Sequence, residues 1–284
     1  MPDLIGGPLD PAAAAPETAP AAGPAAAAPD AAAPEAAAPE AAAPLGPSPR
    51  FSIVIPVHNE AECLDAEVAE LVGELDARGV DYELILAENG SVDETPDMCH
   101  TLAAGHPRIQ ALMVPVPDYG YAMKTGMLAG RGDYIVNFDI DFHDVPFLLA
   151  AGDLLDNGAG IVVGSKLMEG AEDKRSPIRH FISYGFTIIL RLLFDPHMDD
   201  THGMKALRRE VVQKYAPRTV MRQDIFDTEL IIRARRGGVK VAAIPVTVEE
   251  KRKPRSSIVR RIPRTVRALL RLRMVLWKER NAGP

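Results

Sequence analysis

The sequence is poor in cysteine and in long apolar runs. Its 284 residues include two cysteines, Cys63 and Cys99. Two isolated cysteines provide neither the spacing of a zinc site nor a disulfide framework, so a reducing compartment is the default expectation. No uninterrupted apolar stretch reaches the roughly 18 residues needed to cross a bilayer. The composition therefore indicates a globular chain without a transmembrane helix.

The first 49 residues lack basic and aromatic side chains altogether. They are almost entirely alanine and proline, with six acidic residues among them. Such a segment cannot build a core, and its repeated prolines interrupt helices. It also lacks the basic start and apolar centre of a secretory signal. We expect a disordered tail at residues 1–49, a folded domain at 50–255 and a separate C-terminal segment at 256–284.

The net charge is negative before residue 250 and strongly positive after it. The formal net charge is −6 over residues 1–49, −12 over 50–250 and +11 over 251–284. From Pro263 the pattern is helical, with arginines on one face and apolar side chains, Trp277 among them, on the other. A basic amphipathic helix of this kind is typical of a membrane surface. The alternative is a helix packed on the domain with its basic face in water. No other feature indicates nucleic-acid binding.

Strand-like and helix-like segments alternate through the folded part. Apolar, β-branched runs at 51–57, 82–87, 109–114, 134–138 and 161–166 predict five strands. Amphipathic or capped segments between most of them predict helices. This alternation predicts an α/β fold with a mostly parallel sheet and helices on both faces.

A pair of carboxylates follows the strand predicted at 134–138. Asp139 and Asp141 are separated by one residue, and in extended chain they point the same way and can share a divalent cation. His143 continues this spacing. Ligands collect at the carboxyl ends of strands in open α/β sheets, which favours a site here. The alternatives are that the two acids cap the following helix and that His143 packs in the interior.

Several separated motifs together resemble those of family 2 glycosyltransferases, which have the GT-A fold. The resemblance covers about residues 50–260. It rests on Pro56-Val-His-Asn-Glu60, Glu88-Asn-Gly-Ser-Val-Asp93, Gly120-Tyr-Ala-Met-Lys-Thr-Gly126, Asp139-Ile-Asp141, Asp200-Thr-His-Gly-Met-Lys205 and Asp227-Thr-Glu-Leu-Ile-Ile-Arg-Ala234. Within this family the pattern is most similar to the polyprenyl-phosphate sugar synthases of the dolichol-phosphate-mannose synthase type.

The resemblance implies an inverting, metal-dependent hexosyltransferase. It would move a hexose from a nucleoside diphosphate sugar to a polyprenyl phosphate, as a cytoplasmic protein held peripherally on the membrane face. The alternative is a soluble family 2 enzyme acting on a hydroxyl acceptor. A divalent cation, Mg²⁺ or Mn²⁺, would neutralise the departing diphosphate. Asp139 and Asp141 would bind it, and His143 stands where the similar synthases place a glutamine near the metal.

The resemblance also implies which residues bind the donor. The strand-end motifs would hold the base and ribose, Gly120 would allow close backbone approach, and Lys124 would lie near phosphate. A basic loop would close over the diphosphate, although it matches the family only loosely. The implied donor-binding residues are Pro56, Asn59, Glu60, Glu88, Asn89, Ser91, Gly120, Lys124, Asp139, Lys251 and Arg255.

Lys166, Arg179 and Ser183 are the implied acceptor site. Arg179 and Ser183 are four residues apart, on one face of a predicted helix. Two cations and a hydroxyl suit a phosphate monoester, and Arg175 is a competing candidate. Asp141, Asp227 and Glu229 are the implied catalytic residues. A phosphate acceptor is already anionic, whereas a hydroxyl acceptor needs a base, so the choice between Asp227 and Glu229 stays open.

Overall fold

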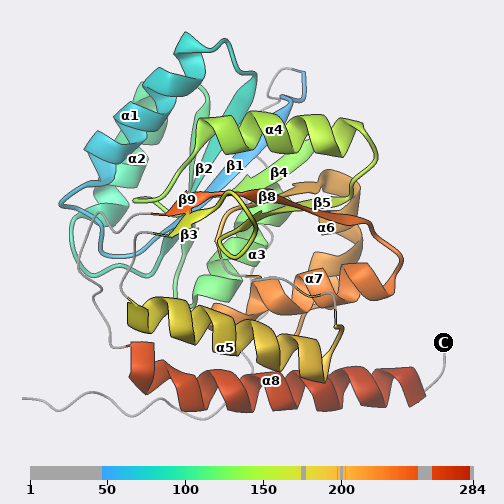
Figure 1. Cartoon of the computed structure of the whole chain (residues 1–284). Helices are drawn as coiled ribbons and strands as arrows, with labels where there is room; N and C mark the ends of the chain where they lie inside the picture. Colours follow the sequence, from blue (N-terminus) through green and yellow to red (C-terminus); the bar gives the residue numbers. More distant parts are fainter. Residues whose placement is uncertain are drawn as a thin grey trace, which may run out of the picture. The chain divides into compact units, whose positions relative to one another are not determined.

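The computed structural model describes residues 47–173, 177–196, 198, 201, 203–248 and 258–281. Within these, a seven-stranded sheet forms the centre of the folded unit (Figure 1), in the order β3-β2-β1-β4-β7-β5-β8. Its strands are β1 Phe51–Val57, β2 Tyr82–Asn89, β3 Ile109–Val114, β4 Tyr134–Asn137, β5 Ile161–Ser165, β7 Lys205–Arg208 and β8 Val241–Pro245. A small second sheet pairs β6, Glu172–Asp173, with β9, Thr247–Val248.

The sheet is mixed, because β7 runs antiparallel to both of its neighbours. Strands β3, β2, β1 and β4 pair in parallel, as do β5 and β8. β7 lies between β4 and β5 and pairs antiparallel with each. The expectation of a mostly parallel α/β sheet is therefore confirmed, with one reversed strand that inserts Lys205 beside Asn137 of β4 and Val163 of β5.

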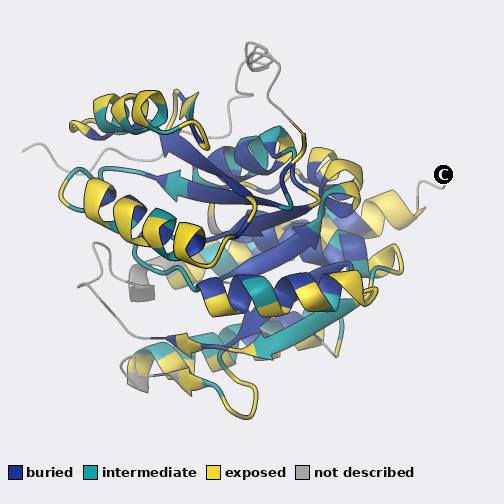
Figure 2. Cartoon of the chain, turned by 90° about the horizontal axis from the view of Figure 1, so that it is seen from above, coloured by how far each residue is buried: buried dark blue, intermediate teal, exposed yellow. Residues whose placement is uncertain are grey.

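Helices pack on both faces of the sheet and bury two apolar clusters. One cluster contains side chains of α1 (Leu64–Ala77), α2 (Thr95–Gly105) and α4 (Val145–Asp156). The other contains side chains of α3 (Tyr119–Ala129), α5 (Pro177–Leu193), α6 (Arg209–Tyr215), α7 (Phe226–Arg236) and α8 (Ile258–Asn281). Two short 3₁₀ turns, η1 Ala216–Arg218 and η2 Gln223–Ile225, connect α6 to α7. Figure 2 shows that burial is greatest in the central strands, whereas the helices expose their outer sides.

Two helices next to the sheet begin at aspartates that cap them. The side chain of Asp118 accepts a hydrogen bond from the backbone nitrogen of Tyr121 at 3.1 Å, and Asp144 accepts one from Phe147 at 2.7 Å. Each carboxylate satisfies one of the unpaired N–H groups of a first helical turn. These caps place α3 and α4 directly after the polar loops at the carboxyl edge of the sheet.

The C-terminal helix is longer than the sequence pattern suggests. It begins at Ile258 and contains Pro263, rather than beginning at that proline. Pro263 lies inside this helix, at a position where proline removes one backbone hydrogen bond. Its Leu269, Leu272 and Leu276 are buried in the same cluster as α7, so one face of α8 packs on the domain.

Candidate active site

The candidate site lies at the carboxyl ends of β1 and β4, where the strand order reverses. The chain proceeds from β1 to β2 and β3 on one side and then returns to place β4 on the other side of β1. In open α/β sheets, such a reversal leaves a crevice between the loops that follow the two strands. The loops here are 58–60 after β1 and 138–144 after β4, and both are rich in polar side chains.

The two carboxylates after β4 lie on a tight turn. The backbone nitrogen of Asp139 donates to the Phe142 oxygen at 3.3 Å, and the Phe142 nitrogen donates to the Asp139 oxygen at 3.0 Å. The segment is thus closed by a pair of backbone hydrogen bonds. The expectation of extended chain with alternating side chains is wrong beyond Phe138, because the reciprocal bonds reverse the backbone there.

Several charges converge on Asp139. Burial raises the pKa of the Asp139 carboxyl above its ordinary value, and the nearby carboxylates of Asp141 and Asp227 raise it further, while Lys205 and Lys166 oppose the shift. A site that gathers three carboxylates around one position suits a hard divalent cation bound by oxygen ligands. The residues present therefore fit a Mg²⁺ or Mn²⁺ ion held by Asp139 and Asp141.

An ion pair inside the domain supports this site. The Lys205 ammonium lies 3.0 Å from the Oδ2 atom of Asp227, and the side chains are 1% and 3% exposed. Lys205 also donates to the Gly203 carbonyl at 2.8 Å, and the Tyr119 hydroxyl donates to Asp227 at 3.3 Å. Oδ1 of Asp227 is buried and accepts no hydrogen bond from any described residue. Asp227 is therefore bound through Oδ2, whereas its buried Oδ1 has no hydrogen bond from a described residue.

The loop after β1 is held against the loop after β2. Asn59 adopts a left-handed conformation with φ of 54°, and its backbone nitrogen donates to the Ser91 hydroxyl at 2.9 Å. The Oδ1 atom of Asn59 accepts from the backbone nitrogen of Val92 at 2.8 Å. The nitrogen of Glu60 donates to the Thr95 hydroxyl at 2.9 Å. The structure therefore brings together three donor-binding candidates. Asn59 and Glu60 follow β1, which contains Pro56, and Ser91 follows β2.

Glu88 and Asn89, at the end of β2, are buried and support neighbouring loops. The Oε1 atom of Glu88 accepts from the backbone nitrogen of Ser91 at 2.6 Å. The Oδ1 atom of Asn89 accepts from the backbone nitrogen of Asp118 at 2.7 Å. Both residues are less than 7% exposed. Their side chains therefore support the loop after β2 and the segment before α3.

Two predicted donor-binding residues, Gly120 and Lys124, contact the segment at residues 217–226. A Cβ atom at Gly120 would lie 2.7 Å from the backbone nitrogen of Gln223 and 2.8 Å from the Cβ atom of Phe226. Gly120 therefore permits α3 to pack against η2 and α7, and its expected role in ligand approach stays a prediction. Lys124 donates to the carbonyl oxygens of Pro217 and Thr219 at 3.4 and 3.2 Å. Burial lowers the pKa of Lys124. The expected position of its ammonium near phosphate stays a prediction.

Glu229 is fully buried and hydrogen-bonded through both oxygens. Oε2 accepts from the backbone nitrogens of Val220 and Met221 at 2.9 and 2.6 Å. Oε1 accepts from Nε of Arg233 at 2.7 Å, and Arg233 in turn contacts Glu279 of α8. A carboxylate with 0% exposure and three donors anchors the loop before α7. Both acids are buried, but Asp227 differs from Glu229 in having an oxygen without a hydrogen bond from any described residue.

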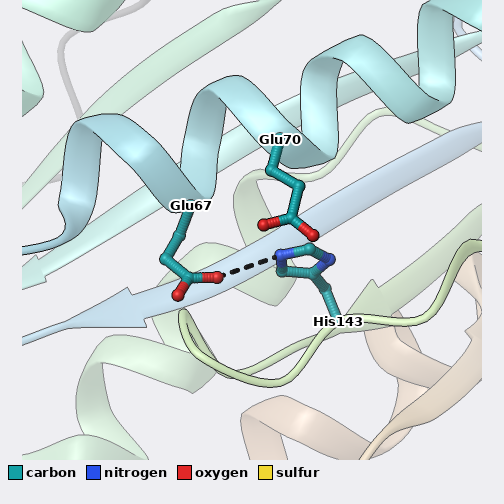
Figure 3. Close-up of side chains that lie close together, drawn as sticks. All are labelled: Glu67, Glu70 and His143. Atoms are coloured by element: carbon teal, nitrogen blue, oxygen red, sulfur yellow. Dashed lines mark ion pairs between the residues drawn. The ribbon is translucent and has the colours of Figure 1, made fainter. Parts of the chain in front are cut away.

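His143 does not face the turn that carries Asp139 and Asp141. Its ring points to helix α1, where Nε2 lies 3.4 Å from the Oε2 atom of Glu67 (Figure 3). The expected third ligand of the catalytic metal is therefore turned away, because the chain reverses at residues 139–142 before it reaches His143. The alternative that this histidine packs in the interior describes its 4% side-chain exposure better.

The acceptor-site candidates lie on β5 and α5. Lys166 follows β5, and a Cβ atom at Gly203 would meet its Nζ atom at 3.5 Å. Its charge acts on Asp139, so Lys166 lies near that carboxylate. Arg179 and Ser183 are one turn apart on α5. Their convergence with Lys166 on one phosphate stays a prediction. Arg175, Lys251 and Arg255 lie outside the described residues.

Two residues of this site were not singled out from the sequence. Lys205 lies in the motif Asp200–Lys205, but it was not assigned a role there. The signal was a lysine opening the apolar strand Lys205-Ala-Leu-Arg, since a charged side chain in a central strand requires a partner. Asp118 caps α3 and also accepts from the backbone nitrogen of Gln223 at 3.1 Å, which joins the loops before α3 and α7.

The mixed sheet, with acidic residues on a turn after β4 at the strand reversal, is that of a GT-A-like glycosyltransferase. The chain belongs to glycosyl transferase family 2, whose pattern matches residues 52–216. It is 29% identical over 215 residues to a dolichyl-phosphate beta-glucosyltransferase of Trichomonas vaginalis, covering 70% of this chain and 64% of that one. It is 26% identical over 250 residues to the Dictyostelium discoideum dolichyl-phosphate beta-glucosyltransferase, covering 80% and 76%. The chain thus spans less than two thirds of the Trichomonas protein's length.

Solved structures share this fold at low sequence identity. Glucosyl-3-phosphoglycerate synthase from Mycobacterium tuberculosis, in complex with Mn²⁺, uridine diphosphate and phosphoglyceric acid, aligns with a TM-score of 0.59. The identity is 23%, and the alignment covers 79% of this chain and 78% of that one. Another structure of that synthase holds Mg²⁺ and uridine diphosphate. These comparisons confirm the GT-A-like fold of the chain.

Within the described part of the chain, no helix is long and apolar enough to cross a membrane.

Proposed function

We propose that this family 2 glycosyltransferase transfers a hexose from a nucleoside diphosphate sugar to a polyprenyl phosphate. The observation that carries the proposal is the division of helix α5 into two sides. Arg179 and Ser183 follow the same helical spacing as the buried Thr187. On another side of α5, a stripe of apolar residues is exposed: Ile178, Phe181, Tyr184, Ile188 and Leu192. A lipid phosphate has an anionic head and an apolar chain, which these two sides match.

Helix α8 lies beside α5 (Figure 1) and also exposes apolar side chains. Arg273 of α8 donates a hydrogen bond to the Leu193 carbonyl at the end of α5. By helical spacing, Leu270, Met274 and Trp277 lie between the buried face of α8 and its basic side chains. Apolar and basic side chains in adjacent stripes suit the headgroup region of an anionic membrane. We therefore propose that α5 and α8 hold the enzyme peripherally on the cytoplasmic membrane face.

The relatives support the acceptor class and indicate a first donor to test. Those named above are dolichyl-phosphate beta-glucosyltransferases, and one solved structure of the mycobacterial synthase contains uridine-diphosphate-glucose. A glucosyl donor with a uridine diphosphate leaving group is the natural starting point. The domain limits follow the same proposal: residues 50–255 as the catalytic domain, and 256–284 as the segment that contacts the membrane.

In the proposed reaction, an acceptor phosphate oxygen attacks the anomeric carbon and the nucleoside diphosphate departs. The attacking oxygen is already anionic, so a strong general base is not required. The chain contributes mainly position and charge: Lys166, Arg179 and Ser183 orient the acceptor phosphate, and the loops at Asn59 and Ser91 hold the nucleoside. Asp139 and Asp141 would hold Mg²⁺ or Mn²⁺, which supplies positive charge for the leaving diphosphate. Asp227 and Lys205 form a buried ion pair whose charges act on Asp139, in the turn at residues 139–142.

The alternative is a hydroxyl acceptor, with Asp227 as the general base. One observation favours it, namely that Oδ1 of Asp227 is buried without a hydrogen bond from any described residue. Against it, the other oxygen of Asp227 forms a buried ion pair with Lys205 at 3.0 Å, which holds the carboxylate in a structural contact. The phosphate acceptor is therefore the preferred assignment.

The acceptor assignment is tested by the substitution Arg179→Ala. A charge-assisted contact of this type is worth about 1.5–3 kcal/mol, or about 10- to 150-fold. We expect the KM for polyprenyl phosphate to rise by that factor, while the KM for the sugar nucleotide changes little. Lys240→Ala, an exposed cation before β8, is the control and should leave both constants unchanged. Equal effects of Arg179→Ala on donor and acceptor constants would contradict a phosphate clasp.

A further inference from the structure

A cluster of three ligand-type side chains lies outside the proposed active site. Glu67 and Glu70 extend from helix α1, and His143 rises to meet them from the segment after β4 (Figure 3). One ligand atom of each residue lies within 4.8 Å of the others. Because positions three apart on a helix are neighbours, the two carboxylates of α1 occupy one face. The cluster therefore connects α1 to the segment between the acidic turn, residues 139–142, and α4.

The histidine points into this cluster without a hydrogen bond to satisfy it. The His143 side chain is 4% exposed, and its Nε2 atom is buried without a hydrogen-bond partner among the described residues. A buried polar atom of this kind costs free energy unless something binds it. Its closest carboxylate oxygen, Oε2 of Glu67, is 3.4 Å away. A charge-assisted hydrogen bond would instead bring the two atoms to about 2.7–2.9 Å.

The 3.4 Å separation is the one expected between two ligands of a tetrahedral ion. Zinc binds histidine nitrogen and carboxylate oxygen at about 2.0–2.2 Å, and tetrahedral geometry then places neighbouring ligands about 3.4 Å apart. One imidazole with two carboxylates leaves the fourth position to water. Imidazole also favours zinc-class ions over Mg²⁺. From this geometry we propose that Glu67, Glu70 and His143 bind a zinc-class divalent ion, separate from the cation held by Asp139 and Asp141.

The ion would connect two parts of the catalytic domain. Glu67 and Glu70 belong to α1, which follows the donor-binding loop at 58–60, and His143 follows the acidic turn by one residue. An ion shared by these elements fixes the turn relative to the donor loop. It also removes the repulsion between two acids on one helix face. The site therefore stabilises the arrangement of the active site without contacting substrate.

The test measures zinc binding in a chain whose catalytic metal ligand has been removed. In the Asp141→Asn background, full-length protein stripped of metal is titrated with Zn²⁺ without nucleotide, by calorimetry. We expect one ion per chain with a dissociation constant in the micromolar range or tighter. Adding Glu70→Gln or His143→Gln should weaken binding at least about tenfold, because even outer-shell partners cost about that much. Adding Glu62→Gln, an exposed glutamate before α1, should change nothing.

Two results would overturn the site. Equal zinc affinity in all four variants would place the ion elsewhere, for example at Cys63, and absence of binding in the Asp141→Asn protein would remove it altogether. Glu70 is exposed, so its variant stays folded even if the histidine variant does not, and circular dichroism checks both. As a second readout, Co²⁺ in the Asp141→Asn protein should give the intense visible absorption of a four-coordinate ion, and Glu70→Gln should abolish it.

Discussion

Lys205 and Asp227 form an ion pair at 3.0 Å, with both side chains almost fully buried between the sheet and α7. The pair lies beside Asp139, whose carboxyl it influences through both of its charges. A buried pair contributes little when intact, since desolvation offsets attraction, but losing one partner leaves an uncompensated charge. The electrostatic environment of Asp139, in the turn at residues 139–142, therefore depends on Lys205 of β7.

Replacing Lys205 with methionine should destabilise the domain strongly. The change leaves the Asp227 carboxylate buried without its cation, and we expect a loss of about 3–5 kcal/mol in the free energy of unfolding. Urea denaturation at neutral pH measures it. The double variant Lys205→Met/Asp227→Leu removes both charges and should recover part of the loss. A single variant as stable as the wild type would show that the pair is solvated rather than buried.

Asp141→Asn should nearly abolish transfer while leaving stability unchanged. Asp141 is partly exposed on the turn after β4, so the domain does not depend on its charge. Its proposed role is to hold the cation that faces the leaving diphosphate. Removing one such electrostatic contact costs about 3 kcal/mol or more, equivalent to at least about 100-fold in rate. Turnover at saturating Mg²⁺ and Mn²⁺ decides the matter, and a variant with half of the wild-type rate would eliminate the metal role.

The surface formed by α5 and α8 should bind anionic liposomes. Phe181 is 77% exposed and Trp277 is 56% exposed, so replacing both with glutamine costs little stability. Each side chain buried in a membrane contributes about 1.5–3 kcal/mol, so the double variant should partition at least about 100-fold more weakly. Cosedimentation measures this. Leu128→Gln, an exposed apolar side chain on α3, is the matched control. Equal partitioning of all three proteins would contradict this membrane surface.

Truncation is less informative for this purpose than point substitution. Removing residues 263–284 would also remove Leu269, Leu272 and Leu276, which are buried in the core. The loss of activity that follows would mix membrane binding with unfolding. The packed face of α8 therefore calls for changes on its exposed side alone.

The attachment of α8 should depend on pH through Glu279. Arg233 donates to both carboxylate oxygens of Glu279 at 2.8 and 2.9 Å, and these hydrogen bonds hold the pKa of Glu279 below its ordinary 4.5. The resulting stabilisation is complete above pH 4.5 and disappears as the pH falls through the lowered folded pKa. The carboxylate is 48% exposed, so solvent limits the contribution to less than about 1 kcal/mol.

The measurement is the stability difference between the wild type and Glu279→Gln as a function of pH. The difference should be present at pH 7 and should diminish in acid below the ordinary pKa of the group. Glu210→Gln, an exposed glutamate on α6, should show no such trend. A difference that grows as the pH falls would reverse the sign and contradict the contact.

The regular elements were largely predictable from the sequence. The strand at Ile109–Val114 has the bounds that its apolar run predicted. Helix α4 received no prediction, although Asp144 and Pro146 mark its start. The orientation of β7 depends on tertiary pairing with β4 and β5, so its four residues alone could not indicate an antiparallel strand.

The sequence predicted which residues lie at the end of β4, but not the directions of all their side chains. Asp139 and Asp141 were placed correctly at the end of β4, because an apolar run followed by carboxylates is a local signal. His143 was misplaced because the reversal at 139–142 arises from backbone hydrogen bonds that the i, i+2 spacing does not encode. The contacts of Gly120 and Lys124 with residues 217–226, about 100 positions further along the chain, could not be read from the local sequence, and the roles of these two residues toward the donor stay predictions.

The central claim is that the acceptor is a polyprenyl phosphate. The most direct measurement is the mass of the product formed when the purified full-length chain is incubated with UDP-glucose, Mg²⁺ or Mn²⁺, and a short-chain polyprenyl phosphate, with GDP-mannose in parallel. Dephosphorylated polyprenol and 3-phosphoglycerate replace the acceptor in control reactions. The account predicts a polyprenyl phosphate whose mass has increased by one hexose, with no product from either control. Transfer to a hydroxyl acceptor, with none to the polyprenyl phosphate, would contradict it.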